Sequence, residues 1–250
     1  MSIDLLLPVA MAVAAGLVGC FAVMRRMSLA ADPLSHVALP GIGVALAMKI
    51  NPLFGAVAML VFGALLVWAL QERAREATEA VIGVVFSVAL ALGSLMTSGE
   101  DLIDALFGGP GVLTWAELVF GFAAAGAVVV FILTQRNSLI ITLVSPEVAR
   151  TAGIEVRRLN LLYLLTFALT IALGLRYMGV LLMGALIIIP AVTAKRIARN
   201  LDGMLLVAVA IAVIATVSGI ELASRLHTET GPIIVLIAAG AFLLSLLRRQ

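Results

Sequence analysis

Residues 3–26 read IDLLLPVAMAVAAGLVGCFAVMRR, an apolar stretch with a single acid that ends in two arginines. A helix needs about 20 apolar residues to cross the hydrocarbon core of a bilayer, so this stretch is long enough for one span. A secretory signal carries basic residues before its apolar part, whereas here Asp4 comes first and Arg25 and Arg26 come last. The stretch therefore predicts a retained membrane span whose amino terminus lies outside the cell.

The composition extends this prediction to all 250 residues. Hydrophobic residues make up 63% of the chain and charged residues only 12%, whereas a soluble domain carries roughly 25% charged residues. Most of the surface must therefore face lipid. The net charge of +2 does not indicate a nucleic-acid surface, because the basic residues lie in short loops between apolar runs. The single cysteine, Cys20, excludes a disulfide framework and a cysteine-based metal cluster.

Nine apolar segments are predicted to cross the membrane as helices, which makes the chain an all-α polytopic bundle with one membrane domain over residues 1–250. The segments are 3–24, 33–48, 52–70, 80–96, 112–134, 161–175, 177–194, 204–222 and 232–247. Eight spans are the alternative, because two of these segments are short and are separated only by Arg176, Tyr177 and their neighbours. A single helix over 161–194 would be about 50 Å long, too long for one crossing, so two spans are preferred.

The basic residues set the orientation of the bundle. With the amino terminus outside, 13 of the 16 lysines and arginines fall in cytoplasmic loops or in the carboxyl tail. They are Arg25, Arg26, Arg73, Arg75, Arg136, Arg150, Arg157, Arg158, Lys195, Arg196, Arg199, Arg248 and Arg249. Lys49, Arg176 and Arg225 are left on the outer side. Because cytoplasmic loops are enriched in basic residues, this distribution predicts an outside amino terminus and a cytoplasmic carboxyl terminus.

An acid and a histidine lie four residues apart in ADPLSH, residues 31–36. This spacing places Asp32 and His36 on one face of a helix. A carboxylate oxygen and an imidazole nitrogen together suit Zn²⁺, Mn²⁺ or Fe²⁺, although two ligands do not complete a coordination shell. The alternative is structural: Asp32 before Pro33 is a good helix start, and His36 then only bonds to a neighbouring helix.

A second motif lies in the longest predicted cytoplasmic loop, residues 135–160, and reads SPEVARTAG over residues 145–153. Ser145 is a helix cap, Pro146 fits the first turn, Glu147 suits the positive end of the helix, and Gly153 terminates it after Arg150. A separately capped helix in a loop indicates a surface for a partner. A plain amphipathic connector explains it equally well.

Acidic residues on the outer side are further candidates. Glu100, Asp101 and Asp104 lie in a loop without basic residues, where they either attract cations toward an entrance, meet a basic partner, or are simply solvated. Glu117 lies near the outer end of a predicted span and is a weaker candidate for lining a path. Glu221 precedes Arg225 by four residues and is expected to form a structural ion pair with it.

The sequence lacks the motifs of several kinds of enzyme. Neither lysine follows the glycine pattern of a phosphate-binding loop, so ATP hydrolysis by this chain is not expected. The sequence also contains no H-E-x-x-H or G-x-S-x-G pattern, which argues against a membrane-embedded enzyme, and we expect no permanently bound cofactor.

Four ordered motifs resemble those of one family. They are RRMSL at 25–29 with DPLSH at 32–36 and LPG at 39–41, TEAVIG at 78–83, SPEVAR at 145–150 with Gly153-Ile154, and the glycine- and proline-containing span 179–194. Together they cover roughly residues 15–200, and the chain resembles the zinc/manganese-type (ABC-3 family) metal ABC transporter permeases. Pro33 departs from the family pattern, in which a small residue follows the aspartate.

The resemblance implies a function and partners. It implies a permease in the bacterial inner membrane that imports a divalent metal ion (zinc, manganese or iron) between two side-by-side permease copies. Asp32 and His36 would contact the metal, and residues 145–153 would dock on a separate cytoplasmic ABC ATPase. An extracytoplasmic metal-binding protein would deliver the ion.

Two other kinds of transporter are alternatives. A secondary, proton-coupled metal transporter predicts inverted repeats and paired ionisable residues at mid-membrane, and no such repeat is evident. An ABC permease for a metal chelate needs a roomier and more aromatic path, and aromatic residues make up only 6% of this chain.

Overall fold

The computed structural model describes residues 3–27, 31–74, 78–96, 115–178 and 180–247, and no strand occurs in these ranges. The described elements are all helices. They are α1 (Ile3–Met24), α2 (Ala31–His36), α3 (Ala38–Ala47), α4 (Pro52–Ala74), α5 (Thr78–Met96), α7 (Trp115–Val144), α8 (Pro146–Thr151), α9 (Val156–Met178), α10 (Val180–Ile197), α11 (Leu201–Leu226) and α12 (Thr230–Leu247).

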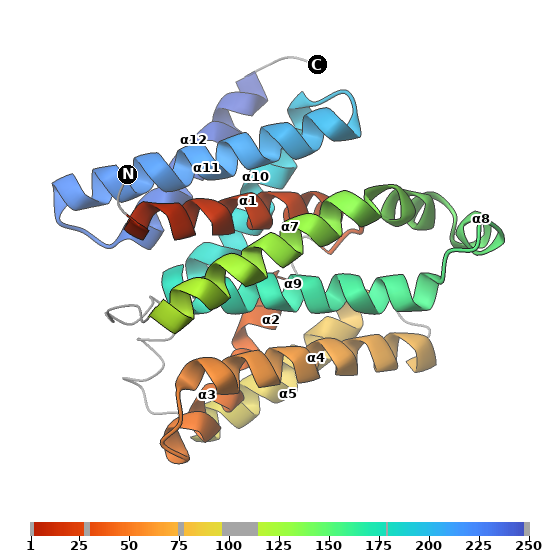
Figure 1. Cartoon of the computed structure of the whole chain (residues 1–250), viewed down its shortest axis with the longest axis horizontal. Coiled ribbons are helices and arrows are strands. Elements are labelled where there is room, and N and C mark those ends of the chain that lie inside the picture. Colours follow the sequence, from red (N-terminus) through yellow and green to blue (C-terminus); the bar gives the residue numbers. More distant parts are fainter. Residues whose placement is uncertain (1–2, 28–30, 75–77, 97–114, 179, 248–250) are drawn as a thin grey trace.

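The first helix is the centre of the bundle. α1 packs against α7, α9, α10 and α11 (Figure 1). Of the most apolar stretch of α1, 72% is buried, whereas the corresponding value for α12 at the edge is 17%. The other side of the molecule is built from α3, α4 and α5, which pack on one another. α9 contacts both sides, and the short helix α2 contacts α5, α9 and α10, so these two helices join the halves.

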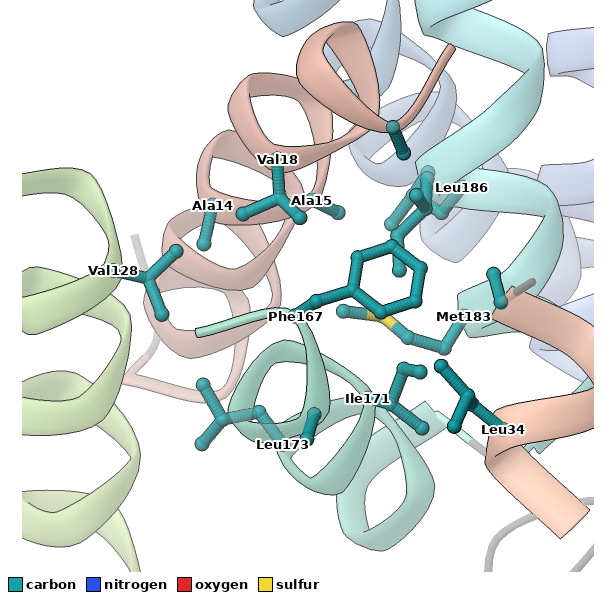
Figure 2. Close-up of a cluster of buried hydrophobic side chains, with 14 of the residues drawn as sticks. Ala14, Ala15, Val18, Leu34, Val128, Phe167, Ile171, Leu173, Met183 and Leu186 are labelled. Atoms are coloured by element: carbon teal, nitrogen blue, oxygen red, sulfur yellow. The ribbon is translucent and has the colours of Figure 1, made fainter. Parts of the chain in front are cut away.

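Small residues let α1 approach its neighbours closely. A Cβ added at Gly19 would overlap the backbone carbonyl of Ile187 in α10, so only glycine fits at this crossing. Beside it lies an apolar cluster to which α1, α2, α7, α9 and α10 all contribute (Figure 2). Phe167 is fully buried in this cluster, and Leu34 of α2 points into it next to Met183.

The spans agree broadly with the hydrophobic pattern. Eight of the nine predicted segments are helical wherever the structure describes them, and the ninth, 33–48, contains two short helices. In the part of the chain that the structure describes, six helices are long and apolar enough to cross a bilayer alone. They are Leu5–Met24, Pro52–Gln71, Glu117–Val144, Val156–Leu175, Leu201–Leu226 and Thr230–Leu247. Pro33–Ala47 and Glu79–Leu95 are shorter apolar helices, and α9 and α10 are two separate helices rather than one.

The predicted cytoplasmic loop at 135–160 is wrong in extent. α7 continues without a break to Val144, and its 30 residues make it about 45 Å long. The polar residues that suggested a loop, Gln135 to Ser138, lie within this helix. Only the short helix α8 and the turns around it separate α7 from α9.

The predicted span 33–48 is not one continuous helix. It breaks at Val37, whose N–H donates to the carbonyl of Leu34 at 3.1 Å in a tighter turn. Pro40 explains the break, because it has no N–H to donate to the carbonyl of His36 one turn earlier. α2 begins at Ala31, so Asp32 lies within the first turn rather than at the cap position.

The contact at Gly19 yields a stability prediction. Gly19→Ala should lower the free energy of unfolding of the detergent-purified chain by about 1–3 kcal/mol, and with it the melting temperature, because the added methyl group displaces α1 from α10. Gly126→Ala in α7 is the matched control, since an added Cβ there meets nothing within 4 Å, and alanine stabilises a helix by up to about 1 kcal/mol. Fluorescence-detected thermal unfolding measures both. Equal melting temperatures for the two variants would contradict the close packing.

Candidate functional site

The predicted metal-binding motif lies on a short helix inside the bundle. α2 contacts α5, α9 and α10, and also α3 and α4. Its residues Leu34 and Ser35 are buried, with Leu34 in the cluster of Figure 2. The packing of Leu34 therefore fixes the rotation of α2, and with it the direction in which the other side chains of the helix point.

His36 presents an unsatisfied ring nitrogen. Its imidazole is half-buried and lies 5.7 Å from the ring of Phe86 in α5, tilted by 55°. The buried Nδ1 atom has no hydrogen-bond partner in the described part of the chain. A buried polar atom without a partner is costly, so such an atom indicates a ligand or a role. A neutral imidazole nitrogen has the lone pair that a divalent transition metal needs.

The position of Asp32 fits a second ligand. The backbone of α2 places it one helical turn before His36 and on the same face. Its side chain lies outside the described residues, so the geometry of the pair remains a prediction. No group of three or more histidine, cysteine, aspartate or glutamate side chains occurs among the residues that the structure describes. These residues of one chain thus offer no closed, four-ligand cage.

The other acidic candidates are not brought to α2. Glu117 is half-buried in the first turn of α7, where it has an interaction partner. α7 packs mainly on α1, α8 and α9 rather than on α2. Glu100, Asp101 and Asp104 lie outside the described residues, so their role at an entrance stays a prediction.

The motif at 145–153 forms a short helix that is bounded at both ends. Ser145 has an extended backbone (φ −155°, ψ 109°), and its hydroxyl oxygen accepts a hydrogen bond from the N–H of Val148 at 3.3 Å. Pro146 is the first helical residue. Gly153 is left-handed, with φ 78°, and the next N–H, that of Ile154, returns to the carbonyl of Ala149 at 2.9 Å. This Schellman arrangement ends α8 sharply.

One face of α8 is open. Ala149 is buried against the bundle, whereas Glu147 and Arg150 are exposed. Val148 is 57% exposed and Val144, just before the helix, is 82% exposed. Sequence reasoning missed these two valines because the local sequence does not distinguish an exposed valine from a buried one. Exposed apolar residues rimmed by charged ones are typical of protein interfaces.

The structure also shows that Arg25, which the sequence suggested only as an orientation signal, is half-buried and has specific partners. The guanidinium of Arg25 stacks on the ring of Tyr163, 4.2 Å from its centroid, and donates to the side-chain oxygen of Asn160 at 2.6 Å. Asn160 in turn donates to Gln71 at 3.2 Å. Burial lowers the pKa of Arg25, and the neighbouring Tyr163 opposes this shift, but an arginine starts so far above neutral pH that it stays charged.

The predicted ion pair on α11 is confirmed. A guanidinium nitrogen of Arg225 lies 2.6 Å from a carboxylate oxygen of Glu221, and both side chains are exposed. An exposed pair of this kind contributes little to stability.

Comparison with known proteins places this arrangement in a family. The profile of the ABC 3 transport family matches residues 1–249. The chain belongs to the ABC 3 transport family. The match covers nearly the whole permease, so it confirms the resemblance drawn from the four motifs. It also confirms that the chain is a multi-pass membrane subunit of an ABC transporter and not an enzyme.

Individual relatives agree with this assignment. The permease is 31% identical over 241 residues to the high-affinity zinc uptake system membrane protein ZnuB of Haemophilus influenzae, covering 93% of this chain and 91% of the relative. It is 33% identical over 239 residues to the chelated iron transport system membrane protein YfeD of Yersinia pestis, covering 94% of this chain and 80% of the relative. Among solved structures, PsaBC from Streptococcus pneumoniae in complex with Fab is similar, with a TM-score of 0.82, 27% identity, and coverage of 97% of this chain and 89% of that one.

The contacts of Arg25 yield a second prediction. Arg25→Gln should destabilise the permease by about 2 kcal/mol or more, because it removes both the charged hydrogen bond to Asn160 and the contact with Tyr163. Arg26→Gln is the matched control, since Arg26 is the adjacent residue and is exposed. Thermal unfolding in detergent compares the two variants. If both variants lower the melting temperature equally, the contacts of Arg25 with Asn160 and Tyr163 do not stabilise the fold.

Proposed function

We propose that this chain is the membrane-spanning permease subunit of an ABC importer for a divalent transition-metal ion: zinc, manganese or iron. The observation that carries the proposal is the buried, unpartnered Nδ1 atom of His36 on α2, within the bundle and one turn from Asp32. A carboxylate and an imidazole are suitable ligands for each of these ions. The names of ZnuB and YfeD, which refer to zinc and to chelated iron, support this range of cargo.

The ligand set is sparse, as a path requires. A site that fills the coordination shell of the ion holds it too tightly for release, whereas two protein ligands and water leave the ion free to move on. In our proposal a second copy of the permease lies beside the first, and the ion passes between them. The second copy would add its own Asp32 and His36, which would compensate for the lack of a larger ligand group among the described residues of one chain.

The proposed topology has nine spans in one membrane domain that lies in a bacterial inner membrane. The amino terminus is outside the cell and the carboxyl terminus is in the cytoplasm. The strong excess of basic residues on one side supports it. Arg25 after α1, Arg150 on α8 and Arg157 at the start of α9 lie together around one cavity, as expected if these helix ends share the cytoplasmic side.

α8 is the proposed docking helix for a cytoplasmic ABC ATPase. The ATPase would supply the energy by hydrolysing ATP, for which this chain has no phosphate-binding motif. Its exposed Val148 and Glu147 offer an apolar anchor beside a charge. The delivery of the ion would fall to an extracytoplasmic metal-binding protein. The transported ion is then substrate, and the permease needs no resident cofactor.

The metal path has a direct test in cells. Asp32→Ala and His36→Ala should each reduce uptake of radioactive zinc or manganese by at least about tenfold, because each removes one of two ligands. The level of the permease in the membrane should stay unchanged. His227→Ala is the matched control, since the second histidine of the chain is exposed at the end of α11. Normal uptake in both Asp32→Ala and His36→Ala would remove α2 from the path.

The coupling surface has a separate test. Val148→Asp should prevent the ATPase from co-purifying with the permease, because it places a charge in the centre of the proposed apolar contact. Thermal unfolding of the isolated permease should not change, since Val148 is exposed. Glu155→Gln, in the turn after α8, is the control for a change of charge nearby. Uptake by the permease without any ATPase would contradict the coupling role altogether.

A further inference from the structure

A groove of about 530 Å³ lies between α3 and α4, which pack side by side (Figure 1). Gly41 of α3 and Gly55 of α4 both line it. A Cβ added at Gly41 would overlap the carbonyl of Gly55, and one added at Gly55 would overlap the carbonyl of Gly41. The two backbones therefore touch at this crossing, and neither glycine has a side chain to fill the space beside it.

The walls of the groove are apolar. Phe54, Ala58 and Phe62 follow one another at four-residue intervals on an exposed face of α4, and Val44 lines the groove from α3. Phe54 and Phe62 are two turns of helix apart, so this wall is about 12 Å long. Met59 adds a flexible side chain of the kind that adapts to irregular apolar ligands. No charged, hydroxyl or amide side chain is among the described residues that line the groove.

A lysine lies at one end of this groove, at the surface of the membrane. The residues from Phe54 to Phe62 belong to the first half of the span Pro52–Gln71, so the groove is at the depth of the lipid tails. Lys49 is exposed and comes three residues before this span, at the level of the lipid headgroups. It forms no ion pair with any residue that the structure describes.

The turn after α3 ties Lys49 to the groove. Lys49 has a left-handed backbone, with φ 56°, and the N–H of Ile50 returns to the carbonyl of Ala45 at 2.9 Å. Glycine is the usual residue at such a helix end, and lysine gives this turn a positive charge instead. Ile50 and Ala45 both line the groove. The charge is therefore fixed, by one peptide bond, next to the apolar wall.

From these observations we infer that the groove binds a phospholipid, with one acyl chain between α3 and α4 and the phosphate of the headgroup beside Lys49. A methylene group is about as large as a water molecule, whose share of the liquid is about 30 Å³, so the groove has room for roughly 15 methylene groups. Lipid tails touch every exposed apolar face of a membrane protein. A tail in this groove has a helix on each side, and the additional van der Waals contacts bind it more strongly than a tail on a flat face.

A second copy of the chain is the other apolar partner to consider for this surface. Two copies related by a two-fold axis would meet through the same patch, which would bring both Lys49 side chains to the same depth and close together. Like charges repel at this distance, whereas a phosphate supplies the opposite charge. The position of Lys49 therefore favours a lipid over a second copy. This inference uses neither the metal path nor the ATPase, so it is independent of the proposed function.

The experiment uses the full chain, delipidated in a neutral detergent, and counts bound lipids by native mass spectrometry. Phosphatidylglycerol, phosphatidylcholine and diacylglycerol with the same acyl chains are titrated separately. Ala58→Trp fills the groove from an exposed position, so the packed core stays intact. Ala127→Trp is the matched control, because Ala127 is also an exposed alanine within a span but does not line the groove. Lys49→Gln removes the charge at the end of the groove, and Lys49→Arg retains it.

We expect wild type, Ala127→Trp and Lys49→Arg each to bind one phosphatidylglycerol in preference to the other two lipids. Ala58→Trp should weaken this binding at least about tenfold, because the indole occupies the place of the acyl chain. Lys49→Gln should weaken it about fivefold, to the level of phosphatidylcholine, because one basic residue near the membrane surface contributes about this much to the binding of an anionic lipid.

Equal binding of phosphatidylglycerol by wild type and Ala58→Trp would exclude the groove as the site. Equal binding by wild type and Lys49→Gln would exclude the phosphate contact, and either result overturns the inference. Conversion of a wild-type dimer to monomers by Ala58→Trp, with no change in bound lipid, would assign the groove to a second copy instead. Metal uptake by the Asp32 and His36 variants is a separate measurement, so failure here and failure of the proposed function are distinguishable.

Discussion

The close contact between α1 and α10 at Gly19 is the constraint on which the position of the candidate site depends. In a membrane there is little hydrophobic force between helices, so association relies on close packing of small residues and on satisfied polar groups. With α1 at the centre, α10 and α9 lie where Met183 and Phe167 form a wall for Leu34. α2 is too short to hold itself in place, and this wall orients it. A displacement of α10 from α1 would therefore displace the proposed metal ligands as well.

The buried polar groups differ in what an unsatisfied atom could bind. Arg25 has an aromatic ring on one side and an amide oxygen at 2.6 Å, although its Nε atom has no partner among the described residues. The fully buried Tyr163 donates to the carbonyl of Val18 at 3.2 Å. These contacts compensate for the loss of water. Nδ1 of His36 and Oγ1 of Thr216 are the other buried side-chain atoms without a partner in the described part of the chain. Of these three atoms, only the imidazole nitrogen of His36 is a usual ligand of divalent transition metals.

Much of this arrangement was predictable from the sequence, and the failures have physical reasons. Apolar runs and loop charges identified the helices, because lipid imposes a long, continuous hydrophobic pattern that is hard to mistake. The extent of α7 was missed because its last ten residues are partly polar, and polarity marks exposure to water rather than the end of a helix. Pro40 was read as part of a motif, although its missing N–H predicts the break at Val37. The caps of α8 were predicted correctly, since Ser145 and Gly153 act through local backbone geometry. The contact between Arg25 and Asn160 spans 135 residues of sequence, and local patterns carry no information about it.

The path from the proposed docking helix to the proposed metal ligands is short. Ser145 caps α8 directly at the end of α7, so the two helices meet without a flexible linker. On its other side α8 leads through Gly153 into α9, and α9 contacts α2. A movement of α8 therefore has a stiff covalent route along α9 to the helix that carries His36.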